Sequence, residues 1–83
     1  MTIAQRQERH EKALTCGNWY RRGLAIRYGF LSKAQQERAL IDPHPQVRAL
    51  TVSMGGLSAA QHLRALADSD WRVRQEANLW STP

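Results

Sequence analysis

Cysteine is nearly absent from this 83-residue sequence, which contains only Cys16. A single cysteine cannot close an internal disulfide or form a cysteine-based metal site, and such scarcity is typical of proteins in a reducing, cytoplasmic setting. Long apolar runs are absent too, since no segment approaches the ~18 apolar residues that a membrane span requires. No apolar stretch follows the first residues, so we expect neither a signal peptide nor a contact with membranes.

The sequence also lacks the motifs of catalysis and of cofactor binding. Its three histidines show no metal-ligand spacing with each other or with Cys16; they are His10, His44 and His62. No Gly-x-Ser-x-Gly nucleophile motif occurs, and the five glycines form no phosphate-binding loop. We therefore expect a protein that is not an enzyme, with no catalytic residue, cofactor, bound metal or small-molecule substrate.

Acidic side chains are few: the chain contains seven of them and twelve basic side chains, which gives a formal net charge of +5. A basic surface attracts nucleic acid and acidic proteins alike. Most of the basic residues are arginine, which is enriched at protein–protein interfaces because its planar group pairs and stacks while losing little hydration. Composition therefore leaves both kinds of partner open.

What the sequence does contain is a repeat. A shift of 26 residues aligns residues 31–54 with residues 57–80 without a gap, and ten of the aligned pairs are identical. These pairs are Leu31/Leu57, Ser32/Ser58, Ala34/Ala60, Gln35/Gln61, Arg38/Arg64, Ala39/Ala65, Leu40/Leu66, Asp42/Asp68, Val47/Val73 and Arg48/Arg74. Residues 5–30 form a more divergent first copy, which keeps Ala13, Leu14 and Arg22 at matching positions. A fixed period in this range indicates a stacked-repeat protein.

Local patterns divide each copy into two short helices. Serine and glutamine three residues apart form capping boxes at positions 32 and 35 and at positions 58 and 61. Pro45 fits the first residue of a helix, and Asp70 is suited to cap the last helix. Gly29 and the pair Gly55-Gly56 end helices. The sequence thus predicts six helices, at about 3–16, 19–28, 33–41, 45–54, 59–67 and 71–79.

The stretch from Leu57 to Arg74, with Leu-Arg-Ala-Leu-Ala-Asp-Ser-Asp-Trp-Arg-Val-Arg at residues 63–74, resembles the leucine-rich-repeat variant and the related HEAT-like repeats. The resemblance is firm over residues 31–83 and loose over residues 5–30. It implies an all-α fold: a short α-solenoid of three stacked helix-turn-helix repeats in one domain, residues 1–83, with copies at about 5–30, 31–56 and 57–82. The chain departs from the variant family at Gly55-Gly56, where an Asn-Pro turn is common. It also lacks the cysteine cluster of some members, so no iron–sulfur centre is implied.

Three arginines share one position of the repeat: Arg22, Arg48 and Arg74. One interpretation is a stripe that binds phosphates or carboxylates. The other, which the resemblance to HEAT-like repeats favours, is that Arg48 and Arg74 pair with the turn aspartates at positions 42 and 68 of their own or a neighbouring copy. The first copy has Cys16 in place of that aspartate, so we expect Arg22 to be the arginine without a partner.

A second row of cations, Lys12, Arg38 and Arg64, lies two residues before the shared leucine of each copy. Because that leucine is expected to face inward, these side chains should project to a flank. A solvated face is the ordinary state of such positions. Three aligned cations would also suit a phosphate backbone, so they are the candidate phosphate-binding residues.

The densest cluster of aromatic and basic residues is Trp19-Tyr20-Arg21-Arg22, with Arg27 and Tyr28 following on the same predicted helix. Such side chains stack on bases or anchor protein interfaces. Alternatively, several of the rings are wedges between copies, since Trp71 occupies the same repeat position as Trp19. We expect Tyr28 to lie in the core, and Trp19 and Trp71 to be half-exposed.

The C-terminal edge carries Leu79 and Trp80 on the last predicted helix. A solenoid ordinarily shields its last apolar face with a polar cap, so an exposed tryptophan there would mark an interface. The alternative is that Trp80 folds back onto its own copy.

These patterns favour a non-catalytic protein–protein interaction module. It would dock on a larger protein, or form a homodimer, through its C-terminal edge and an arginine-lined groove; the candidate partner-binding residues are Trp19, Tyr20, Arg21, Arg22, Trp71, Leu79 and Trp80. A small phage-encoded inhibitor, such as an anti-CRISPR protein, is a special case of this class. The alternative is a nucleic-acid-binding HEAT-like protein with an arginine-rich face, although the acidic residues dilute the field of that face.

Overall fold

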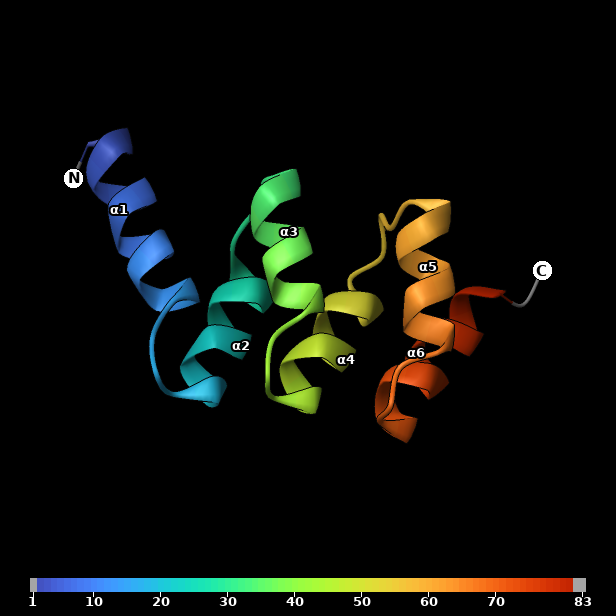
Figure 1. Ribbon diagram of the computed structural model, residues 1–83. Coiled ribbons are helices and arrows are strands. Elements are labelled where there is room, and N and C mark those ends of the chain that lie inside the picture. Colours follow the sequence, from blue (N-terminus) through green and yellow to red (C-terminus); the bar gives the residue numbers. More distant parts are fainter. Residues whose placement is uncertain (1, 82–83) are drawn as a thin grey trace.

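The computed structural model describes residues 2–81, which form six α-helices and no strand. The helices are α1 (Ile3–Leu14), α2 (Trp19–Tyr28), α3 (Lys33–Leu40), α4 (Pro45–Ser53), α5 (Ala59–Leu66) and α6 (Trp71–Ser81) (Figure 1). The all-α prediction is confirmed, and each predicted helix end lies within two residues of the observed one. None of these helices has the length and apolar character that crossing a membrane demands.

Three of the helices begin with the same side-chain arrangement. The hydroxyl groups of Ser32 and Ser58 accept a hydrogen bond from the backbone N–H three residues on, at 3.1 Å in both cases. The glutamine at that position returns the bond, because its amide oxygen accepts from the serine N–H at 2.9 Å. Thr2 and Gln5 do the same at the start of α1, in addition to the two predicted boxes. Each box satisfies N–H groups that a helix start leaves open.

The even-numbered helices each begin on a different capping residue. Asn18 accepts hydrogen bonds from two N–H groups at the start of α2, and the ring Nδ1 of His44 accepts from the N–H of Gln46 at the start of α4. The carboxylate of Asp70 accepts from the N–H of Arg72, which confirms its predicted capping role. All three side chains are acceptors at a point where helical N–H groups lack backbone partners.

The helices form three successive pairs that lie side by side along the chain. In Figure 1, α1, α3 and α5 make one row, and α2, α4 and α6 make the other. Helix α4 packs against both α2 and α6, and each odd-numbered helix packs against the helix that follows it. Gly55 and Gly56, with φ of +80° and +74°, reverse the chain between the second and third pairs, in a conformation that side-chain-bearing residues rarely adopt. The result is an elongated molecule of 41 × 23 × 16 Å.

The core consists of one apolar cluster at each junction between pairs. The first junction contains Leu14, Ile26, Ala39 and Val47, and the second contains Ala49, Val52, Ala65, Val73 and Ala77. Residues at the same repeat position make equivalent contacts, since Ile26 and Val52 each pack against the following helix pair. Of the shared leucines, Leu14 is buried, whereas Leu40 and Leu66 are half-buried against the second cluster. The buried residues of the second junction are thus alanine and valine, whereas the first also holds Leu14 and Ile26.

The first and last helix pairs carry polar residues at the repeat positions that are apolar and buried at the junctions between pairs. The position of Ile26 and Val52, which faces the next pair, is held in α6 by Asn78, and Asn78 is exposed. The position of Val47, which faces the preceding pair, is held in α2 by Arg21, also exposed. At this position the C-terminal edge is therefore more polar than the sequence suggested, and Arg21 makes the N-terminal edge polar in the same way.

Candidate functional site

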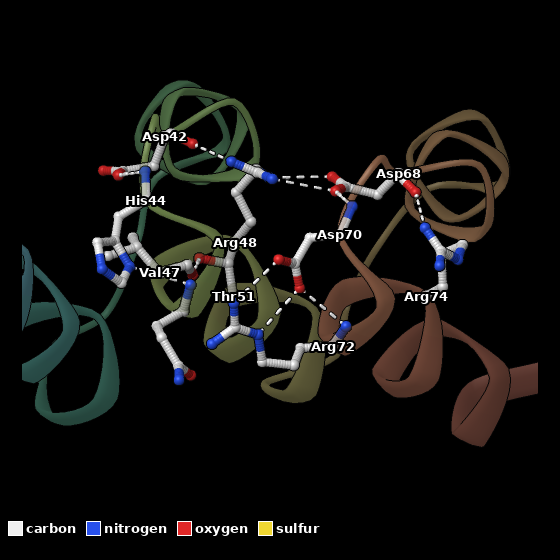
Figure 2. A network of polar contacts seen from close by, with 10 residues as sticks. Asp42, His44, Val47, Arg48, Thr51, Asp68, Asp70, Arg72 and Arg74 are labelled. Carbon is white, nitrogen blue, oxygen red and sulfur yellow. Dashed lines mark hydrogen bonds and ion pairs between the residues drawn. The ribbon is translucent and has the colours of Figure 1, made fainter.

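The arginines at the shared repeat position tie one helix pair to the next. Arg22 donates from Nε and Nη2 to the two carboxylate oxygens of Asp42, at 2.8 and 3.0 Å, and from Nη1 to the carbonyl oxygen of Cys16 at 2.7 Å. One repeat later, Arg48 donates in the same way to Asp68, at 3.0 and 3.1 Å, and to the carbonyl oxygen of Asp42 at 2.7 Å (Figure 2). Each arginine thus joins the turn of its own pair to the turn of the following pair.

The expectation that Arg22 lacks a partner is wrong. Its acceptor is the turn aspartate of the next copy, 20 residues away, so the missing aspartate of its own copy does not matter. Both side chains of the pair are largely shielded, with 14% of Arg22 and 9% of Asp42 exposed. The hydrogen bonds to Asp42 raise the pKa of Arg22 above its ordinary value. Because Arg22 and Arg48 are engaged with carboxylates, they are not available to hold phosphates.

The row of candidate phosphate-binding residues is also partly neutralised. Arg38 forms an ion pair with Glu11 at 2.7 Å, and Arg64 forms the matching pair with Glu37. Lys12 is exposed and makes no ion pair within residues 2–81. Two of the three cations therefore face a carboxylate, and both are about half-exposed, so these pairs are weak, water-screened contacts between neighbouring copies.

The two glutamates of these pairs have lowered pKa values. Gln35 donates to Glu11, and Gln61 donates to Glu37, both at 2.8 Å. This hydrogen bond, followed by that from the arginine, lowers the pKa of each carboxyl below its ordinary 4.5. The charged form is thus favoured in the native protein.

We expect the combined change Glu11→Gln and Glu37→Gln to flatten the loss of stability in acid. The native carboxyls have lower pKa values than the unfolded ones, so the unfolded state binds more protons as the pH falls. Their contribution is complete above pH 4.5 and disappears as the pH falls through the lowered native values. Melting temperatures from pH 7 into this acid range test the prediction, with Glu8→Gln as control. Identical acid profiles of variant and wild type would contradict it.

The aromatic side chains of α2 line a groove against α4. Its walls are formed by Trp19, Tyr20, Gly23, Leu24, Arg27, Tyr28, Gln46, Val47 and Leu50, and its volume is about 290 Å³. The Trp19 ring stacks on His44, with 4.2 Å between ring centroids and 9° between planes, and meets Tyr20 edge to face. Tyr20 and Leu24 are 60% and 40% exposed. The groove therefore presents an apolar floor that is open to solvent.

The structure separates the predicted aromatic and basic cluster into three parts. Trp19 and Tyr20 lie in the groove, whereas Arg22 belongs to the row of shielded ion pairs and Arg21 lies exposed on the outer edge. Tyr28 is 78% exposed and lines the groove, so the expectation of a core position is wrong. Leu24 and Leu50 complete the groove, although no motif marked them. The only sequence signal for them was an apolar residue at the same place in two copies.

The predicted residues of the last helix lie at the far end of the molecule. Trp71 is 61% exposed, in agreement with expectation, and the Arg72 guanidinium lies 5.8 Å from its ring centre. Trp80 leans back over the second copy, since a Cβ at Gly55 would lie 3.0 Å from its ring. Leu79 is exposed beside it. These residues do not join the α2–α4 groove, so the molecule has two separate candidate surfaces.

The unpaired positive charge gathers in the first copy. Residues 1–30 hold six basic and two acidic side chains, which amounts to four of the five net positive charges of the chain. Within residues 2–81, the basic side chains of this copy without an ion pair are Arg6, Arg9, Lys12, Arg21 and Arg27. The third copy is neutral, with three residues of each sign. The aromatic groove therefore lies in the most positive part of the molecule.

In residues 2–81, no three His, Cys, Asp or Glu side chains gather in a way that could hold a metal ion. Comparison of the chain with models of protein families, with curated proteins and with solved structures gives no match. The interpretation of function therefore depends on the geometry of the surfaces.

Proposed function

We propose that the chain is a short α-solenoid of three HEAT-like repeats that acts as a non-catalytic protein-binding module. The observation that carries this proposal is the α2–α4 groove, in which several aromatic and aliphatic side chains remain open to solvent. Contiguous exposed apolar surface on a small protein commonly marks an interaction site. Tyrosine and tryptophan are also the residues that most often dominate the binding energy of protein interfaces.

The charge around the groove selects the kind of partner. Arg27 lines the groove and makes no ion pair within residues 2–81, and Arg21 on the same helix is likewise unpaired there. Opposite charges on the two surfaces speed association and disfavour wrong partners. The occupant we propose is an acidic segment of a larger protein, with one large apolar side chain that enters the groove.

The contacts of the arginines weigh against nucleic acid as the main partner. Four of them are engaged with carboxylates of neighbouring copies: Arg22, Arg38, Arg48 and Arg64. A phosphate backbone would have to compete with these carboxylates. Single-stranded nucleic acid could still stack its bases on Tyr20 and Tyr28, so it is the alternative that the experiment must separate.

A fluorescence titration with short synthetic peptides tests the proposal. A peptide with one tryptophan among glutamates is expected to bind, and the same peptide with lysines in their place is not. Tyr20→Ala with Tyr28→Ala should weaken binding by about thirtyfold, which corresponds to about 2 kcal/mol, because both exposed rings belong to the groove. Trp71→Ala, which removes a similarly exposed ring outside the groove, is the matched control.

Oligothymidine at two salt concentrations is the second probe. If the protein binds it with affinity that falls steeply with salt, and ignores both peptides, the function is nucleic-acid binding instead. Light scattering of the same samples reports whether the protein forms a homodimer. A dimer that dissociates after the double tyrosine change would identify a second copy as the occupant of the groove.

A further inference from the structure

Arg74 is the last member of the row of arginines, and it is only partly satisfied. Its Nη1 donates to the carbonyl oxygen of Asp68 at 2.7 Å, the same distance that Arg22 and Arg48 keep to their own turns. In Arg22 and Arg48, Nε and Nη2 donate hydrogen bonds to the aspartate carboxylate of the next copy. Within residues 2–81 the corresponding atoms of Arg74 have no acceptor, and Figure 2 shows Arg74 at the end of the row with a single bond to Asp68.

The guanidinium of Arg74 is held ready for a carboxylate. The bond from Nη1 fixes one side of the planar group, as it does in the two arginines that already bind aspartate. The opposite side, with Nε and Nη2, is the geometry that binds a carboxylate through two parallel hydrogen bonds. Because the orientation is set before binding, little side-chain entropy remains to be lost.

The surface around Arg74 suits a docking edge that also tolerates water. Asn78 and Gln75 stand where the second copy has the buried Val52 and Ala49, and both are exposed. The edge can therefore remain solvated in the free protein, and recognition would depend on charge-assisted hydrogen bonds more than on apolar burial.

We infer that the α5–α6 edge recognises an aspartate in a helix–helix turn of another protein, which docks as a further helix pair with its carboxylate on Arg74. The aspartate is specified because the two filled positions of the row both hold a turn aspartate, 20 residues after the arginine. The site shares no residue with the α2–α4 groove. It can therefore exist whether or not the groove binds peptides.

A second copy of the same chain does not fit this edge. Its own first turn carries Cys16 at the position of Asp42, so it offers no carboxylate to Arg74. Its α2 also carries the exposed Arg21 at the position of the buried Val47. The wild-type chain should therefore not stack head to tail.

These two differences supply a defined probe. The chain with Cys16→Asp, Arg21→Val and Arg74→Gln presents the turn aspartate at its N-terminal edge and has lost the arginine at its C-terminal edge. Mixed with wild type, it is expected to form a one-to-one complex in sedimentation velocity. Wild type that carries Arg74→Gln should bind this probe about tenfold to a hundredfold more weakly, as should a probe that carries Cys16→Asn in place of Cys16→Asp.

Two results would overturn the inference: no complex between folded partners, or a complex that is equally tight after Arg74→Gln. Circular dichroism establishes that each chain is folded. If the probe does not fold, the wild-type chain is titrated with N-acetyl-aspartate whose α-carboxyl is amidated, and followed by the side-chain Nε–H resonances of its arginines. The resonance of Arg74 should move while those of Arg22 and Arg48 stay, and the α-amide of N-acetyl-asparagine, which has no carboxylate, should move none. An unmoved Arg74 resonance would be equally decisive against the site.

Discussion

Replacing Asp42 with alanine is expected to lower the free energy of unfolding by roughly 3–5 kcal/mol, because it removes one partner of a shielded ion pair. Asp42 is 9% exposed and accepts both hydrogen bonds from the Arg22 fork. It also accepts from the N–H of His44 at 2.8 Å, in the turn that leads into α4. Without it, Nε and Nη2 of the largely buried Arg22 guanidinium and the backbone N–H of His44 would lose their acceptor. In a domain of this size, that loss is a large share of the total stability.

Urea denaturation measures this effect, and the row of arginines offers a matched comparison. Asp68→Ala removes the equivalent carboxylate one repeat later, where Arg48 and the N–H of Asp70 are the donors, so a loss of similar size is expected. In a double-mutant cycle, Arg22→Ala should remove most of the penalty that Asp42→Ala causes. A loss below about 1 kcal/mol for Asp42→Ala would show that the pair contributes no more than an exposed one.

Ile26→Ala should cost roughly 2–5 kcal/mol, because Ile26 is the large side chain at the centre of the first junction. It is only 2% exposed and packs with Leu14, Ala39 and Val47. Alanine would leave a cavity that the neighbouring side chains can fill only in part.

The change at Ile26 should also be local in its consequences. The pair α1–α2 meets the rest of the molecule through this junction, so its amides should exchange faster than those of α4–α6. Ile41→Ala removes the same atoms from a side chain that is 66% exposed, and it should change stability by about 0.5 kcal/mol or less. Equal losses from the two isoleucine variants would mean that the first junction is not a packed core.

The helices could be predicted because their starts are determined locally. A serine and a glutamine three residues apart are enough to define a capping box, and Pro45 marks the first turn of α4 without any knowledge of the fold. The shift of 26 residues then extended each assignment to the next copy. The start of α1 was also predicted at residue 3, although its capping box of Thr2 and Gln5 lies outside the repeat and did not belong to the prediction.

The partners between copies could not be predicted in the same way. An alignment shows which residues share a position, but it does not show whether a side chain turns toward its own copy or the next one. The sequence predicts an Arg22 without a partner, because its own copy has Cys16 in place of the turn aspartate, whereas the carboxylate that Arg22 binds is that of Asp42 in the following turn. Only the packing of the pairs decides which copy supplies the carboxylate.

The prediction of which shared positions are buried was wrong at Tyr28 for a related reason. The sequence predicts a core position for Tyr28, yet Tyr28, Met54 and Trp80 are all at least half-exposed. This position of the repeat therefore lies at the surface in every copy. Conversely, the sequence shows that Asn78 stands in the third copy where the second copy has Val52. It does not show that this position faces the next helix pair, which is what makes the edge of α6 polar.

The contacts among the helices also bear on how the chain folds. The main contacts join helices within one pair or in adjacent pairs, so the chain closes only short loops to form them. Proteins dominated by such local contacts fold quickly, and their nucleus can form wherever a pair first meets a neighbour. Helix α4 is the element that touches neighbours on both sides, against α2 and α6. The central pair is therefore the natural nucleus, from which order spreads outward to both ends.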